Sequence, residues 1–256
     1  SEAVSIEEPV RRLEALSKLL HHVQRERGAS CAWAGLGRCE GSPFDLGAFR
    51  HRTDEAATVV GDGAIHERIR SIRRLADDSS LRQATEFYAI FSHFCSLCEH
   101  LLEQQEVVLA QCDPVALRIT LCTFARLKES CGRQRAFLCG ALALPESETP
   151  KFSSRTFADL VVCVHQQRYF IERLERDAPA AVLELMRPGF VKPTELAAVQ
   201  RQLELNFDVA AVRLLLTPER CWVIHTEHME LLHKIEVSLY SAAIHSFVLE
   251  QQQLTQ

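Results

Sequence analysis

The sequence predicts an all-α fold made of two four-helix bundles that share long antiparallel helices. Apolar residues recur at intervals of three and four along most of the 256 residues, as they do on one face of a helix. Gly and Pro, which interrupt helices, number only 10 and 9. The strict apolar and polar alternation of a half-buried strand is scarce. Long helices joined by short turns pack naturally as antiparallel bundles.

Helices are predicted wherever the helical spacing persists between Gly, Pro or capping residues. Gly61-Asp62-Gly63 ends the second helix, and the polar run from Asp77 to Ser80 supplies capping side chains for the fourth. Asp113-Pro114 opens the fifth with a cap and a first-turn Pro. The polar segment 145–153 is an expected loop. The predicted helices cover about residues 7–34, 45–60, 65–76, 81–112, 113–144, 154–176, 179–186, 193–216 and 217–250.

We expect one domain over 1–256, with bundle halves of roughly 1–145 and 146–256 that share or swap helices. With 47% hydrophobic residues, the chain can bury a sizeable core. Its longest apolar runs are far shorter than the roughly 20 residues of a membrane-spanning helix. The chain begins at Ser1 rather than Met. We therefore expect a piece of a longer protein, separated from an N-terminal or C-terminal partner domain.

Charge and cysteine usage limit the partners. The formal net charge is −5, which disfavours nucleic-acid binding through a basic surface. The ten Cys are too few for a disulfide scaffold, and several occupy apolar helical positions where a free thiol behaves as a small hydrophobe. This usage favours a reducing compartment such as the cytoplasm, although the even count leaves disulfides possible.

The most informative feature is that each of two predicted helices carries an Arg in its apolar stripe, the seam that faces the core. The first seam is Leu13, Leu16, Leu20, Val23, Arg27 and Ser30, and the second is Leu117, Leu121, Phe124, Lys128, Cys131, Arg135, Leu138 and Leu142. A buried unpaired charge costs several kcal/mol, so each seam Arg needs a partner. That partner is either an acid such as Glu26 or Glu129, in a structural salt bridge, or an exogenous anion.

An anion site would use the small residues beside these arginines. Two converging guanidinium groups bind a small oxyanion through charge-assisted hydrogen bonds. Gly28 and Ala29 leave room beside Arg27, and Ser30 offers a hydroxyl. Gly132 is expected to leave similar room near Arg135.

These residues also carry a resemblance to the NIT family of nitrate- and nitrite-sensing domains. LLHHVQRERGAS at 19–30 resembles the family's L-x-x-x-Q-x-E-R-G-x-S opening, and Arg52-Thr53-Asp54 loosely resembles R-x-x-T-D, with Arg50 an equal match. RLKESCGRQRA at 126–136 resembles K-E-x-x-G-x-E-R-A, with Gln134 in place of the usual Glu. WVIHT at 222–226 and LLHKIEVSL at 231–239 resemble the closing W-x-x-x-T and L-x-x-V-E-x-x-L. In this region His228 stands where Arg is common and Ile235 where Val is common.

The resemblance spans about 13–249, with its motifs in order. It implies two four-helix bundles that bind nitrate or nitrite and control an attached output such as a kinase, cyclase, chemotaxis or antiterminator module. By matched motif, Arg27 and Arg135 are the expected anion ligands, with Arg25 and Arg133 beside them. The expected partners are this small anion and a second copy in a homodimer, with no cofactor, metal, nucleic acid or membrane.

Other function classes find less support. A helical interaction or dimerisation module without a small ligand remains the main alternative, since long amphipathic helices allow it. The single Glu230-x-x-His233 element is too little for a di-iron centre. Cys95 and Cys98, flanked by His93 and His100, form at most a zinc half-site within a helix. With no Gly-x-Ser-x-Gly motif, and Gly35-Leu36-Gly37 after a helix rather than a strand, we expect no enzyme.

Overall fold

The computed structural model describes residues 7–36, 45–78, 83–110, 115–151, 154–206 and 209–254. Within these ranges the chain forms ten α-helices and one 3-10 helix without a strand, which confirms the all-α prediction. The helices are α1 (Glu7–Leu36), α2 (Leu46–Val60), α3 (Gly63–Asp78), α4 (Ala84–Leu109), α5 (Val115–Ala143), the 3-10 helix η1 (Glu146–Lys151), α6 (Ser154–Asp177), α7 (Ala180–Phe190), α8 (Thr194–Asn206), α9 (Val209–Leu215) and α10 (Pro218–Leu254).

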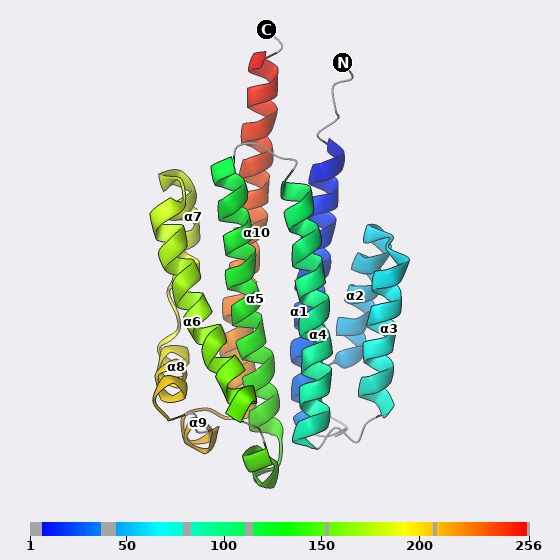
Figure 1. Cartoon of the computed structure of the whole chain (residues 1–256), viewed down its shortest axis with the longest axis vertical. Helices are drawn as coiled ribbons and strands as arrows, with labels where there is room; N and C mark the ends of the chain where they lie inside the picture. Colours follow the sequence, from blue (N-terminus) through cyan, green and yellow to red (C-terminus); the bar gives the residue numbers. More distant parts are fainter. Residues whose placement is uncertain are drawn as a thin grey trace.

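The helices form two bundles around a shared centre. α1 packs against α2 and α4, and α3 closes this first bundle against α4 and α2. In the second bundle α5 packs against α6 and α10, with the short helices α7, α8 and α9 around them. α1 and α5 contact each other along the boundary and run in the same direction, whereas α4, α6 and α10 run antiparallel to α5 (Figure 1). The α1–α5 contact is therefore where the two bundles meet.

The buried apolar residues form two core clusters. One is centred on Leu16, Leu20 and Phe94, where α1 meets α4 and α5. The other surrounds Phe87 and Phe137 and extends to α8, α9 and the start of α10. The seams of α1 and α5 are buried as their spacing predicts, which fixes the inward orientation of every residue in phase with them.

Local chemistry accounts for the ends of α2 and α3. The Asp45 carboxylate accepts from the Ala48 backbone N–H at 3.0 Å and caps α2. Gly61 ends α2 with φ of +72°, in the left-handed region that glycine enters without a steric penalty. The Asp62 carboxylate then accepts from Ala64 N at 2.8 Å and caps α3.

Several predicted boundaries are wrong. Asp77 and Asp78 belong to α3 and do not cap α4, which begins after Gln83, while Ser79 and Ser80 lie outside the described residues. Residues 146–151 of the expected loop form η1. The predicted helix 193–216 is two helices, α8 and α9.

One more helix end differs from its prediction, and two other predictions stay untested. α7 continues through Pro188 to Phe190, because a proline in the last turn removes only one backbone donor. The expected cap at Asp113-Pro114 lies outside the described residues. The division into halves at about 145 stays a prediction, since α5 contacts helices of both bundles.

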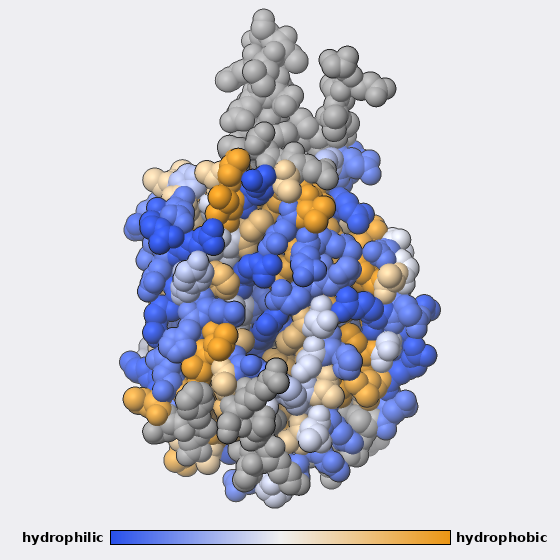
Figure 2. Space-filling view, viewed as in Figure 1, coloured by the Kyte–Doolittle hydropathy of each residue, from blue (hydrophilic) through white to orange (hydrophobic). Residues whose placement is uncertain are grey.

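The surface is largely polar. Figure 2 shows a mainly hydrophilic face on which apolar side chains are scattered among charged ones. Among the described helices, none is long and apolar enough to cross a lipid bilayer.

Candidate functional site

Arg27 lies at the boundary between the bundles and is held by Glu129. Its side chain is fully buried, and Nη1 and Nη2 donate to the two carboxylate oxygens of Glu129 at 2.6 and 3.2 Å. Although burial alone would lower the pKa of Arg27, the Glu129 carboxylate raises it above its ordinary value. The salt bridge that the sequence left as one option for Arg27 is therefore present, with Glu129 as the acid.

Arg135 is also fully buried but is held differently. Its Nη2 donates to the backbone carbonyl of Gln24 at 2.8 Å, and its Nη1 lies 3.5 Å from Thr226 Oγ1. Its guanidinium carbon lies 5.2 Å from the centre of the Trp222 ring. Among the described residues no carboxylate makes an ion pair with it. Burial, together with the positive charges of Arg27 and Arg25, lowers the pKa of Arg135 to about 10.

Gln24 connects the two buried arginines. Its backbone carbonyl accepts from Arg135, while its side-chain Nε2 donates to Glu129 Oε2 at 2.8 Å. The same glutamate holds Arg27. A displacement of α1 at Gln24 would therefore change the hydrogen bonds of both Arg135 and the Arg27–Glu129 pair.

Gly28 of α1 lies against the arginine of α5, and Gly132 of α5 lies against the arginine of α1. A Cβ at Gly28 would lie 3.0 Å from Arg135 Nε, and a Cβ at Gly132 would lie 2.8 Å from Arg27 Nη2. The sequence placed each glycine beside the Arg of its own helix, and the structure adds the guanidinium of the opposite helix as a neighbour. Because α1 and α5 run in parallel at close range, each glycine makes room for the guanidinium of the opposite helix.

The remaining predicted site residues surround this pair. Arg25 Nη1 forms an ion pair with Glu230 Oε1 at 3.2 Å, and its guanidinium lies over the Phe49 ring at 5.3 Å. Arg133 bridges Glu99 and Glu129, and its Nε donates to Glu129 Oε1 at 2.9 Å. Ser30 is buried one turn beyond Arg27 on the same helix. The structure therefore gathers all five predicted residues along the α1–α5 boundary.

The region has unused hydrogen-bond donors and one unbalanced positive charge. The Nε–H groups of Arg25, Arg27 and Arg135 are buried and have no hydrogen-bond partner in the described part of the chain. Glu129, Glu99 and Glu230 neutralise Arg27, Arg133 and Arg25. Arg135 alone of these four is left without a carboxylate, so the site could be neutralised by one monovalent anion.

One known protein family matches most of this chain. The family described as nitrate and nitrite sensing, NIT, matches residues 18–244, which is nearly the whole chain. This chain belongs to the NIT family. Membership indicates a sensing or regulatory role rather than a catalytic one.

A solved structure supports the fold of this NIT domain. The structure of the NasR transcription antiterminator superimposes with a TM-score of 0.72 at 20% sequence identity, covering 94% of this chain and 69% of that chain. At this identity the likeness concerns the fold. A comparison with curated proteins finds no match.

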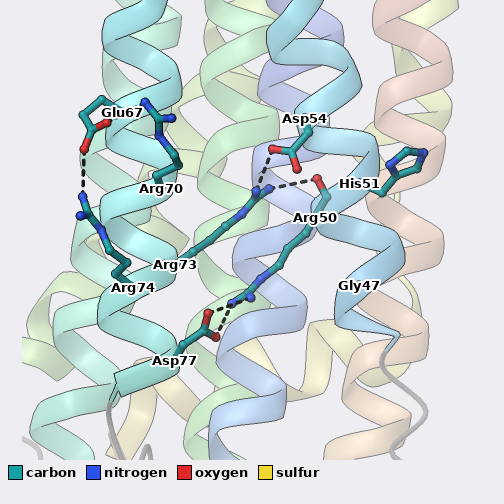
Figure 3. Close-up of a pocket in the computed structure, with 9 residues that line it drawn as sticks. All are labelled: Gly47, Arg50, His51, Asp54, Glu67, Arg70, Arg73, Arg74 and Asp77. Carbon is teal, nitrogen blue, oxygen red and sulfur yellow. Dashed lines mark hydrogen bonds and ion pairs between the residues drawn. The ribbon is translucent and has the colours of Figure 1, made fainter.

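An open groove of the NIT domain is also rich in arginine but differs from the buried site. It lies between α2 and α3, and its arginines point toward acids of the same groove (Figure 3). Arg50 pairs with Asp77 at 2.8 Å, and Arg73 pairs with Asp54 at 2.7 Å. Arg70 and Arg74 share Glu67, and Arg73 also pairs with Glu26, so each arginine of the groove has a carboxylate partner, unlike Arg135.

The two metal motifs considered from sequence have other contacts. Glu230 pairs with Arg25, and His233 Nδ1 lies 3.3 Å from Lys128 Nζ. Cys95 Sγ lies 3.5 Å from Arg27 Nη1, and Cys98 is buried in the core. Glu230 and Cys95 thus contact arginines, and His233 contacts Lys128 and also Glu236 at 3.5 Å.

Trp222 and Thr226 are the site residues to which sequence reasoning assigned no role. Both lie on α10, one turn apart, and both contact Arg135. Their W-x-x-x-T spacing was the signal that could have found them, because residues four apart share one helix face. What the sequence did not supply is which face of α10 meets α5.

Proposed function

We propose that this NIT domain senses nitrate or nitrite by binding one anion beside Arg135, where α1, α5 and α10 meet. The observation that carries the proposal is the buried guanidinium of Arg135, which lacks a carboxylate partner among the described residues. A buried unpaired charge costs several kcal/mol, and a bound anion would remove that cost. Arg27, whose charge is paired with Glu129, would contribute its free Nε–H to the anion.

The chemistry of nitrate and nitrite fits these surroundings. Each is a planar oxyanion with one negative charge, matching the single unbalanced positive charge. A guanidinium presents rigid coplanar N–H donors and is more weakly hydrated than an ammonium group, which suits planar oxyanions. Sulfate carries two charges and would overcompensate Arg135.

A cavity between α4, α5 and α6 would offer a route of entry from the Arg27 side of the boundary. It has a volume of about 300 Å³ and is lined by Arg133, Cys95 and Phe137, among others. Cys95 also contacts Arg27, so this cavity reaches the outer side of the Arg27–Glu129 pair. Arg133, which is partly exposed, would attract an anion there before it passes inward.

The signal would leave through α10. This helix carries Trp222 and Thr226 at Arg135 and then continues to Leu254. Its end lies at the same end of the molecule as the start of α1 (Figure 1). An anion that binds one packing of α1, α5 and α10 more tightly than another would shift the equilibrium between them. That shift would reach a signalling module joined at this end.

Isothermal titration calorimetry with sodium nitrate in chloride-free buffer tests the proposal. The wild-type chain should bind one nitrate per chain. Arg135→Met should abolish the heat of nitrate binding, while circular dichroism shows unchanged helix content. Arg168→Met is a matched control, because Arg168 is exposed and pairs with Glu204 on the surface. Unchanged nitrate affinity in Arg135→Met would exclude this site.

The alternative function, a helical interaction module without a small ligand, makes a different prediction. Nitrate, nitrite, chloride and sulfate would then change neither heat nor stability specifically, while stability would rise with protein concentration. The homodimer expected from the fold class would appear in the same concentration series.

A further inference from the structure

Two cysteines and one histidine meet in the core, one helical turn from Arg135. Cys139 lies on α5, and Cys221 and His225 lie one turn apart on α10. Cys139 Sγ and Cys221 Sγ are 3.5 Å apart, and Cys221 Sγ is 3.5 Å from His225 Nδ1. All three ligand atoms lie within 4.8 Å of one another, and all three residues are buried. In the described part of the chain this is the one such cluster of His, Cys and carboxylate groups.

We propose that Cys139, Cys221 and His225 bind one thiophilic metal ion with a filled d shell, Cu(I) being the expected occupant. Thiolate and imidazole ligands together suit Cu(I) and Zn2+. Structural Zn2+ sites almost always use four protein ligands. Cu(I) is satisfied by two or three soft ligands, which is the number that this cluster supplies.

The distance between the two cysteine sulfurs already fits a metal ion bound to both. Two sulfurs that each lie about 2.3 Å from one metal are separated by roughly 3.5 to 4 Å at the usual coordination angles. The observed sulfur separation is 3.5 Å. Because Cys221 and His225 are four residues apart on one helix, α10 presents two ligands on a single face and α5 closes the site with the third.

Binding requires a defined movement of protons. His225 Nδ1 lies 2.8 Å from the Cys221 carbonyl oxygen, which can only accept, so Nδ1 carries the ring proton in the metal-free state. When the metal bonds to Nδ1, that proton moves to Nε2, which lies 3.5 Å from Gln134 Nε2. The Gln134 amide must then turn to accept the proton, and its Oε1 leaves the donors of Gln167 and Gln200. Each thiol loses its proton to solvent. One bound Cu(I) therefore forms two metal–sulfur bonds and one metal–nitrogen bond and releases two protons.

The charge of the loaded site favours Cu(I) over Zn2+. Two thiolates with Cu(I) carry a net charge of −1, whereas two thiolates with Zn2+ are neutral. Arg135 precedes Cys139 by one turn of α5 and lacks a carboxylate partner within the described residues. The negative Cu(I) site would balance its charge. This inference uses different ligands from the proposed anion site, although both sites would neutralise the same charge of Arg135.

An anaerobic competition titration tests the metal site on the full chain. Cu(I) is distributed between the protein and the chromogenic chelator bathocuproine disulfonate, with ascorbate to keep copper reduced. The wild type should hold one Cu(I) per chain. Cys139→Ser and Cys221→Ser should each weaken binding at least about 100-fold, and His225→Gln about 10-fold or more. Cys131→Ser is the matched control, because Cys131 is another buried thiol on α5, and its affinity should stay within about twofold.

Thermal melting without copper shows whether each variant is folded, and Cys139→Ala replaces Cys139→Ser if the serine variant unfolds. The apparent affinity of the wild type should rise about 100-fold per pH unit near neutrality, because two protons are released. Equal Cu(I) affinities for Cys139 and Cys131 variants would overturn the proposal. So would a pH dependence that reports no released proton.

Discussion

Gly28 on α1 lies directly against the guanidinium of Arg135 on α5, so that a Cβ at position 28 would come within 3.0 Å of Arg135 Nε. The opposite pair repeats the arrangement, with Gly132 against Arg27 at 2.8 Å. Each glycine thus makes room for a buried charge on the neighbouring helix. The R-G of one motif and the G-x-x-R of the other are parts of one interface.

Replacing Gly28 with Ala should weaken nitrate binding while changing stability little. The added methyl must displace Arg135 or Trp222, which a Cβ would approach to 3.1 Å. Ala is a better helix former than Gly by about 1 kcal/mol, which offsets the strain in the unfolding free energy. We expect about a tenfold loss of nitrate affinity by calorimetry. Gly63→Ala is the control, because nothing lies within 4 Å of a Cβ there. Equal affinities for the two variants would contradict the role given to Gly28.

The two buried arginines should differ when each is replaced by Met. Removing Arg27 leaves the buried Glu129 with Arg133 and Gln24 only, and should lower the free energy of unfolding by about 3 kcal/mol. Removing Arg135 leaves no buried carboxylate unpaired and removes an uncompensated charge, so without anion it should leave the free energy of unfolding unchanged or raise it by about 1 to 4 kcal/mol. Urea denaturation in chloride-free buffer measures both. A larger loss for Arg135→Met than for Arg27→Met would show that Arg135 has a counter-charge in the protein.

Trp222 should report the bound anion. Its ring packs on the Arg135 guanidinium at 5.2 Å, so an anion there changes the field on the indole. We expect nitrate to change tryptophan emission saturably in the wild type and in Trp33→Phe, the other tryptophan being removed in that variant. Trp222→Phe should lose the saturable component and keep only linear quenching. A saturable signal that persists in Trp222→Phe would place the anion elsewhere.

Acid should destabilise the domain through His21. Burial first, and then the positive charge of Lys128, lowers the pKa of His21 far below its ordinary value of 6.5. The unfolded chain therefore binds more protons below pH 6.5, and stability falls as the pH drops. Between pH 7 and 5 this residue should cost about 2 kcal/mol.

Urea denaturation of His21→Phe at the two pH values checks this. The variant should lose about 2 kcal/mol less than the wild type, since phenylalanine keeps the stacking on His233 but cannot be protonated. His51→Gln is the control, because His51 is exposed and should leave the pH dependence unchanged. An identical pH dependence in His21→Phe and the wild type would mean that His21 is not buried as a neutral ring.

Much of the fold could be predicted because its long helices have regular seams. The spacing that leads from Val23 to Arg27, and from Phe124 to Arg135, places both arginines in the core, and both are fully buried. The break between α8 and α9 was missed because the apolar spacing of 193–216 continues across it. Periodicity records which face is apolar, but it does not register a change in helix direction.

The contacts across helices could not be predicted. That Glu129 and not Glu26 holds Arg27 depends on the rotation of α5 relative to α1, and Glu26 pairs instead with Arg73. Cys139 and Cys221 are 82 positions apart, and no local pattern links them. Such pairings follow from how helices pack, which the sequence of a single helix does not contain.

Thermal melting of the wild type and Arg135→Met in nitrate, nitrite, chloride or sulfate tests the central claim most directly. At 100 times its dissociation constant, a specific anion should stabilise the wild type by about 2.7 kcal/mol, a shift of several degrees. The account predicts a saturable shift with nitrate or nitrite, absent with chloride and sulfate, and lost in Arg135→Met. Equal small shifts with all four anions, or a nitrate shift that survives in Arg135→Met, would contradict it.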